Sequence, residues 1–250
     1  MSPVTAIGIP LIQLKSVDSS NNYAMAQVQA QLAEHGTTWL AEYQTAGRGQ
    51  RGKSWEASPG QNIIMTTAIV PTGILIHHQF QLSMAVALAC NDFLAHYALH
   101  YTSIKWPNDI YWKDRKAGGI LIENVLQGNE WKYALVGIGL NINQTTFDPA
   151  LKNPVSLKQV TGKHYELPAL AKELCICLEN RWQQLQRDSH LIFTQYNQHL
   201  YKLNEIVRLK KDNVIIEAKL LGVNEQGALM IDTGIPTAIP FGEVEWLLDH

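Results

Sequence analysis

The chain has 250 residues, of which 46% are hydrophobic and 17% charged, and 20 Lys and Arg against 22 Asp and Glu give a formal net charge of −2. This balance excludes a largely disordered chain and argues against a protein built mainly to hold nucleic acid, because such proteins carry a basic excess. No apolar run approaches the roughly 20 residues that span a bilayer, so we expect no membrane partner. Three cysteines and the lack of a secretory signal pattern favour a reducing compartment, and therefore a cytoplasmic protein.

The first hundred residues alternate helical and strand patterns around one glycine-rich loop. Capping residues at 18–21 precede a helical pattern, and Gly36 is a typical residue to follow its end. In chain order we expect a helix at 23–35, a strand at 37–43, a loop at 45–60, a strand at 62–70 and a helix at 80–99. The last helix is mostly apolar, which predicts a central place in the core.

The remainder of the chain changes character near Asn204. Before it, the patterns predict strands at 104–112, 119–126 and 131–142, followed by amphipathic helices at 168–185 and 189–203. After it, short strand patterns alternate with tight turns, which is typical of a small β-barrel. We therefore expect an α+β domain over residues 1–203 and a small barrel domain over residues 204–250.

A basic loop lies among regularly spaced glycines. Three of the four basic residues in the first hundred, Arg48, Arg51 and Lys53, fall within residues 47–55. Glycines allow backbone N–H groups to approach an anion closely, and the cations add charge. The loop therefore predicts an anionic, phosphorylated ligand, with a solvated basic loop as the alternative.

The same loop matches two well-known phosphate-binding patterns by letter. Gly47-x-Gly49-x-x-Gly52 fits the dinucleotide fingerprint, and Gly47 with Gly52-Lys53-Ser54 fits a Walker A loop. Both patterns require a helix directly after the loop, because the helix N-terminus completes the anion site. Pro59-Gly60 and a strand pattern follow instead, which disfavours both interpretations.

Three later segments carry chemically useful residues. Residues 105–109, Lys-Trp-Pro-Asn-Asp, offer a cation and oxygen ligands such as Asp109 that suit Mg²⁺, although a simple surface turn is the alternative. Lys116 ends a charged turn and precedes an apolar strand pattern. Its side chain could therefore reach into a binding site or simply lie in solvent. Glycines within the strand pattern at 137–143 often mark a close approach of backbone or ligand.

Taken together and in this order, these segments resemble the catalytic domain of the biotin–protein ligases. The resemblance runs from about residue 18 to residue 143, through segments 18–21, 41–55, 105–109, 115–121 and 137–141. It implies a mixed β-sheet packed with helices, of the class II synthetase-like kind, and an SH3-like C-terminal barrel. Only 17 residues precede the first matching segment, so we expect the short form of the family, without an N-terminal DNA-binding domain.

The resemblance also implies a two-step reaction. Biotin and ATP, with Mg²⁺, would form biotinyl-5′-AMP, and a lysine of a biotin carboxyl carrier protein would then accept the biotin. We expect a monomer or homodimer that binds no nucleic acid. A lipoate ligase or octanoyl transferase, a P-loop nucleotidase and a biotin-sensing regulator remain the alternatives.

The site residues implied by the resemblance fall into four groups. Lys116 and Arg48 would be catalytic, and Asp109 would hold the metal. The biotin-binding residues would be Ser19, Ser20, Asn21, Gln44, Gly47, Arg48, Gly49, Gln50, Lys116 and Gly119. The ATP- or adenylate-binding residues would be Arg51, Lys53, Trp55, Lys105, Asn108 and Asn141. Gln50 stands where the family usually has arginine, so we expect looser retention of the adenylate, partly compensated by Arg51.

Overall fold

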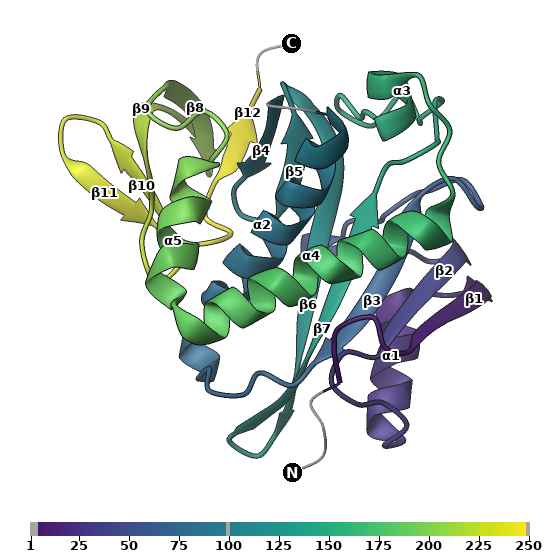
Figure 1. Cartoon of the computed structure of the whole chain (residues 1–250). Coiled ribbons are helices and arrows are strands. Elements are labelled where there is room, and N and C mark those ends of the chain that lie inside the picture. Colours follow the sequence, from purple (N-terminus) through teal and green to yellow (C-terminus); the bar gives the residue numbers. More distant parts are fainter. Residues whose placement is uncertain (1–4, 99–100, 249–250) are drawn as a thin grey trace.

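A seven-stranded sheet forms the centre of the computed structural model, which describes residues 5–98 and 101–248 (Figure 1). Its strand order is β1-β2-β3-β7-β6-β5-β4; β1 (Leu11–Val17) and β2 (Thr38–Gln44) are parallel, and all other neighbours are antiparallel. The other strands are β3 (Ile63–Ile69), β4 (Thr102–Lys105), β5 (Asp109–Trp112), β6 (Arg115–Gln127) and β7 (Glu130–Leu140). The mixed sheet expected from the resemblance is confirmed.

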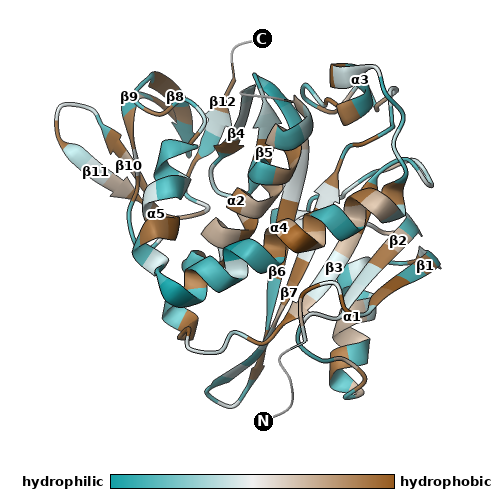
Figure 2. Ribbon diagram, viewed as in Figure 1, coloured by the Kyte–Doolittle hydropathy of each residue, from teal (hydrophilic) through white to brown (hydrophobic). Residues whose placement is uncertain are grey.

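Helices cover the two faces of this sheet unequally. On one face lie α2 (Gln79–Ala98), α4 (Leu167–Arg187) and α5 (Ser189–Gln198), with the apolar α2 buried in the main core as predicted. Figure 2 shows polar and apolar residues alternating along α4, whose buried side chains face inward. On the other face, α1 (Ser20–Gln29) packs a small core against Trp39 and Leu135. The thinner cover on the α1 face leaves room there for a site.

The C-terminal part forms a second, five-stranded antiparallel sheet. Its order is β11-β10-β9-β8-β12, with β8 (Ile206–Lys211), β9 (Val214–Val223), β10 (Leu229–Asp232), β11 (Pro236–Ile239) and β12 (Glu245–Leu247). This agrees with the SH3-like barrel implied by the resemblance. Buried residues of both sheets join one continuous apolar cluster, and Trp106 Nε1 donates to Gly227 O at 3.0 Å. The division into domains at 203/204 therefore stays a prediction.

Several expected elements have different bounds in the structure. The strand expected at 104–112 is two strands, β4 and β5, because the segment around Pro107 turns the chain back on itself and Pro lacks the N–H that a ladder needs. The helix expected at 23–35 already ends at Gln29, and Gln31 has a left-handed φ of 58°. Residue 99, the expected end of the central helix, lies outside the described residues.

Four further short elements complete the chain. Neither the strand β1 nor the helix α3 (Leu157–Thr161) was expected from the sequence. Two 3₁₀ turns, η1 (Gln50–Gly52) and η2 (Ile76–His78), also occur. In the part of the chain that the structure describes, no helix combines the length and the apolar character needed to cross a membrane.

Candidate active site

The site lies on the sheet face that carries α1, where two strands offer glycines. Gly119 on β6 faces Gly139 on β7, and Leu121 faces Gly137, so these four residues share one face. A Cβ placed at Gly137 would overlap Asn21 Oδ1, and one at Gly139 would overlap the Trp55 ring. The expected close approach at these glycines is therefore confirmed, and it brings two distant segments onto the strands.

Near the start of α1 lies a group of hydroxyl and amide side chains, all of them buried except the half-buried Gln44. We call it the hydroxyl–amide cluster; its members are Ser19, Ser20, Asn21, Gln44 and Thr66. Ser20 N donates to Gln44 Oε1 at 2.7 Å, and Thr66 Oγ1 lies 2.8 Å from Ser20 Oγ and 2.6 Å from Asn21 Oδ1. Thr66 was not expected at the site, because nothing in a buried strand pattern distinguishes a functional threonine.

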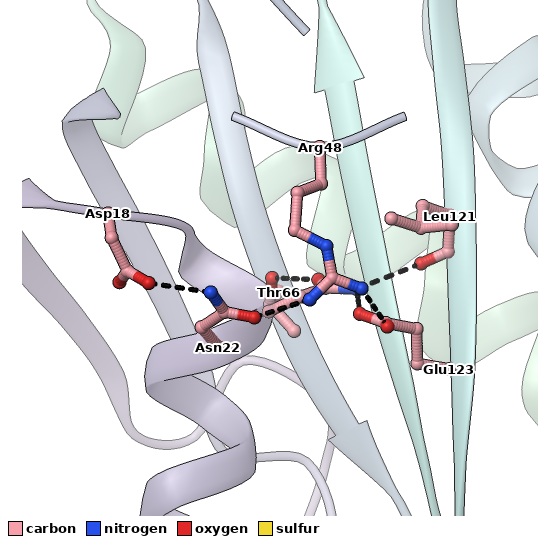
Figure 3. Close-up of polar contacts among 7 residues, drawn as sticks. Asp18, Asn22, Arg48, Thr66, Leu121 and Glu123 are labelled. Atoms are coloured by element: carbon pink, nitrogen blue, oxygen red, sulfur yellow. Dashed lines mark hydrogen bonds and ion pairs between the residues drawn. The ribbon is translucent and has the colours of Figure 1, made fainter. Parts of the chain in front are cut away.

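A chain of polar contacts joins this cluster to the glycine-rich loop (Figure 3). Asn21 Nδ2 donates to Glu123 Oε2 at 2.8 Å, and the other carboxylate oxygen of Glu123 pairs with Arg48. Arg48 also donates to Asn22 Oδ1, and Asn22 Nδ2 donates to Asp18 Oδ2 at 2.6 Å. The hydrogen bond from Asn22 is the main cause that lowers the pKa of Asp18. Arg48 thus lies between α1 and β6.

The glycine-rich loop folds back on itself as a short hairpin. Gly49 N donates to Lys53 O at 2.7 Å, and Trp55 N donates to Gly47 O at 2.9 Å. No α-helix follows before β3 in this described stretch, so the structure supports rejecting both the dinucleotide fingerprint and the Walker A interpretation. A cavity of about 530 Å³ opens between the loop and the Leu121 and Glu123 side chains of β6.

Beyond Gly119, the site becomes basic. Lys116 Nζ lies 2.7 Å from Asp109 Oδ1 and 5.8 Å from the centre of the Trp55 ring. Asn108 Nδ2 donates to Ile120 O at 2.9 Å, and Asn141 Nδ2 donates to Lys116 O at 3.3 Å. The two asparagine amides therefore hold the β6 backbone at Lys116 and four residues after it.

Lys105 is the most buried cation of this end. Its Nζ lies 5.4 Å from the centre of the Tyr111 ring and 5.3 Å from that of Trp246, which comes from β12 of the second sheet. Burial lowers the pKa of Lys105 to about 8, and Asp109 opposes that shift. The charges of neighbouring ammonium groups contribute to the same lowering of the pKa; with Lys105 they form what we call the lysine cluster, Lys53, Lys105, Lys116 and Lys152. Trp246 and Lys152 were not expected from the sequence.

Asp109 is the acidic residue available to a metal here. Within residues 5–98 and 101–248, no three His, Cys, Asp or Glu side chains gather as a metal site. Mg²⁺ in nucleotide sites is commonly held by one or two carboxylates together with substrate phosphates and waters. A single carboxylate among cations therefore fits a magnesium ion that arrives with a polyphosphate.

The structure places most expected site residues around one cavity and its basic extension. Arg51 also lines the cavity; its backbone is left-handed (φ 57°), and its Cζ lies 3.9 Å from a Cβ placed at Gly242, in the turn after β11. Glu123 joins the site from β6 although no motif marked it. The second sheet thus reaches the loop and Lys105 at separate points.

Comparisons with known proteins agree with this arrangement. The model of the biotin/lipoate A/B protein ligase family matches residues 14–141. The chain is 32% identical over 206 residues to a biotin--[acetyl-CoA-carboxylase] ligase of Paracoccus denitrificans, covering 78% of this chain and 84% of that protein. It is 28% identical to the bifunctional ligase/repressor BirA of Bacillus spizizenii, covering 88% of this chain and 68% of that protein.

A solved structure gives the same fold over nearly the whole chain. The biotin protein ligase from Aquifex aeolicus in complex with biotin and ATP superimposes with a TM-score of 0.80 at 25% identity. The alignment covers 96% of this chain and 99% of that one. The shared fold includes both sheets.

Proposed function

Because the chain belongs to the biotin/lipoate A/B protein ligase family, we propose that it is a biotin–protein ligase. It joins biotin to a lysine of an acceptor protein through biotinyl-5′-AMP and releases diphosphate and AMP. One observation carries this proposal: Asn21 of the neutral hydroxyl–amide cluster contacts Glu123, which lines the cavity under the glycine-rich loop, and Lys53 of the lysine cluster lines the same cavity. A neutral polar head group and a polyphosphate can therefore lie end to end.

The hydroxyl–amide cluster suits the ureido ring of biotin. That ring presents one carbonyl oxygen and two N–H groups, and it needs donors and acceptors at fixed places. Ser20 is already hydrogen-bonded to Gln44 through its backbone N–H and to Thr66 through its hydroxyl, so the orientations of these side chains are set before a ligand arrives. Leu121 borders the same cavity and offers apolar contact to the ligand's hydrocarbon part. A site of this kind rejects analogues that leave its polar groups unpaired.

The first chemical step brings two anions together. A carboxylate oxygen of biotin attacks the α-phosphorus of ATP, the bond to the β-phosphate oxygen breaks, and diphosphate leaves. Lys116 and Lys105 stabilise the charge that develops on the α-phosphate oxygens and on the leaving group. Mg²⁺, held on the protein side by Asp109, would offset phosphate charge when bound. Trp55, beside Lys116 and Gly139, would contact the adenylate.

In the second step, the neutral amine of the acceptor lysine attacks the activated carbonyl carbon. A C–N bond forms, the C–O bond to AMP breaks, and the amine proton passes to solvent. The loop at 47–55 forms one wall of the cavity, and its closure over the adenylate would exclude water that would otherwise hydrolyse it.

The acceptor is proposed to be a biotin carboxyl carrier domain. Relatives in Paracoccus denitrificans and Mycobacterium tuberculosis are named biotin--[acetyl-CoA-carboxylase] ligases, which supports this partner. We propose a monomer or homodimer, and the net charge of −2 supports a function without nucleic acid.

Incubation with labelled biotin, ATP, Mg²⁺ and a carrier domain tests the proposal directly. We expect label on the acceptor lysine and none on a carrier whose lysine is changed to arginine. Labelled lipoate and octanoate, offered in parallel, should stay unincorporated. Incorporation of these acids in place of biotin, or ATP hydrolysis that needs no biotin, would contradict the proposal.

A further inference from the structure

Glu123 lies outside every motif that led to the site, yet it contacts two of its parts. It follows Leu121 by two residues on β6, so its side chain lies on the same sheet face as the cavity. Oε2 accepts from Asn21 Nδ2 at 2.8 Å, and Oε1 pairs with the Arg48 guanidinium (Figure 3). One carboxylate therefore joins the start of α1 to the glycine-rich loop across 102 and 75 positions of sequence.

We propose that Glu123 is a positioning residue for the ligase reaction, holding Arg48 and the Asn21 amide in one arrangement so that the loop stays over bound biotin and its adenylate. This inference depends on the proposed function. It assigns Glu123 no contact with the reacting atoms, because its two oxygens are already occupied by protein donors.

The negative charge of Glu123 is what the arrangement requires. Arg48, Arg51 and Lys53 are positively charged residues of one loop and line the same cavity. Without a carboxylate partner, repulsion from the other two cations would push the Arg48 guanidinium out of its present position. An ionised carboxylate accepts from both neighbours, whereas a glutamine amide offers one oxygen and turns an NH₂ group toward the other donor.

A second anchor fixes the opposite side of the guanidinium. Arg48 Nη1 donates to Asn22 Oδ1, while Asn22 Nδ2 donates to Asp18 Oδ2 at 2.6 Å. Arg48 is thus held from α1 and from β6 at once, which leaves its guanidinium plane little freedom. Removing the β6 side would let the loop move away from the cavity while its other anchor remained.

The exposure of the pair separates positioning from folding. The side chains of Arg48 and Glu123 are 42% and 25% exposed, and ion pairs of this kind contribute little to the stability of a fold. Loss of the pair should therefore change ligand retention much more than the melting temperature. The charge of the carboxylate, rather than its size, should decide the outcome.

The test compares Glu123→Gln with a matched control, Glu130→Gln. Glu130 lies in the same β6–β7 hairpin and pairs with Lys132 at 2.7 Å. For Glu123→Gln we expect the KM for biotin and the rate of biotinyl-adenylate release to rise about tenfold, the worth of one charge-assisted hydrogen bond. The KM for ATP should change less than twofold, the Tm should be unchanged, and Glu130→Gln should behave as wild type in every measurement.

A double-variant cycle shows whether Glu123 acts through Arg48. If it does, Arg48→Lys combined with Glu123→Gln should be no more impaired than the worse single variant. Glu123→Asp, which keeps the charge on a shorter side chain, should recover part of the biotin affinity and serves as the probe if Glu123→Gln folds poorly.

Wild-type KM and release in Glu123→Gln, or losses that multiply in the double variant, would overturn the inference. A fall in Tm that accounts for the lost activity in both Glu123 variants would also overturn it. These outcomes differ from a failure of the proposed function, in which the wild-type chain itself forms no biotinyl-adenylate.

Discussion

At the α1 end of the site, polar side chains are hydrogen-bonded to one another, whereas at the other end Lys116 pairs with Asp109 and further ammonium groups lie around Lys105. Ser20, Asn21 and Thr66 are buried and satisfied within the protein. Lys105, in contrast, is buried beside other lysines, and burial together with their charge lowers its pKa to about 8.

The difference corresponds to the charge of what each end would bind. A neutral head group contributes no charge, so the protein must present donors and acceptors that are already oriented. A polyphosphate brings several negative charges of its own, so an excess of cations in the free protein is neutralised on binding. The charges of the lysine cluster are thus balanced only when the polyphosphate is bound, whereas the hydrogen bonds of the hydroxyl–amide cluster are already formed without a ligand.

The largest expected effect comes from the lysine end. Lys116→Ala should lower the rate of biotinyl-adenylate formation at least tenfold, because it removes the cation beside Asp109 where phosphate charge develops. Lys132→Ala is the control, since Lys132 pairs with Glu130 on the same sheet and away from the cavity. Single-turnover measurements with labelled ATP, together with Tm values, check the prediction. Full activity with Lys116→Ala would show that its role is misassigned.

Two alanine substitutions on β7 should affect the α1 end and the lysine end of the site differently. Gly137→Ala places a Cβ onto Asn21 Oδ1, and Gly139→Ala places one onto the Trp55 ring. We expect Gly137→Ala to raise the KM for biotin roughly tenfold and Gly139→Ala to raise mainly the KM for ATP, because each displaces a different neighbour. Steady-state kinetics with each substrate varied in turn measures this; equal effects of both variants on both KM values would refute the division into two ends.

The pH dependence of the lysine end follows from Lys105. Its pKa of about 8 lies below the ordinary 10.5, so Lys105 loses its charge as the pH rises through about 8. The charged and titratable groups around it are Asp109, Tyr111, Lys53, Lys116 and Lys152. We expect kcat/KM for ATP to fall about tenfold between pH 7 and pH 9, and Lys105→Arg, which stays charged, to move this fall to higher pH. An identical profile for the variant would assign the fall to another group.

Local patterns predicted the parts of the site that lie within one segment. The glycine-rich loop is recognisable because its glycines and cations are concentrated in a few neighbouring positions. The Lys-Trp-Pro-Asn-Asp segment and Lys116 were ambiguous by themselves and were assigned to the site through the resemblance. The helix at α2 and the strands β3, β6 and β7 were likewise expected, since long apolar periodicity survives without tertiary information. The rejection of a Walker A loop followed from Pro59-Gly60 and the strand pattern after it.

Contacts between distant segments could not be predicted in this way. Thr66 and Asn21 are 45 positions apart, and Asn21 and Glu123 are 102 apart, so only the folded sheet brings them together. Trp246 reaches Lys105 from the second sheet for the same reason. β1 was missed because it is an edge strand whose side chains are largely exposed, which weakens the alternation that marks a strand.

The smallest expected effect concerns Gln50, the departure within the glycine-rich loop. Gln50 begins η1, and the following Arg51 turns toward Gly242, so the cation nearest in sequence lies against the second sheet. Gln50→Arg would add a charge to the loop that lines the cavity, and we expect biotinyl-adenylate release to slow about threefold through added charge-assisted hydrogen bonding.

Arg51→Gln tests the companion hypothesis that Arg51 partly compensates for Gln50. If it does, Arg51→Gln should speed adenylate release in the wild-type background and do so less in Gln50→Arg, where a second cation is present. Pre-formed labelled biotinyl-adenylate, chased with unlabelled ligand, gives these rates. Because neither substitution changes the contacts of Glu123 with Asn21 and Arg48, the affinity for biotin itself should stay unchanged in both variants. A parallel loss of that affinity would contradict a role for Gln50 and Arg51 that is confined to the adenylate.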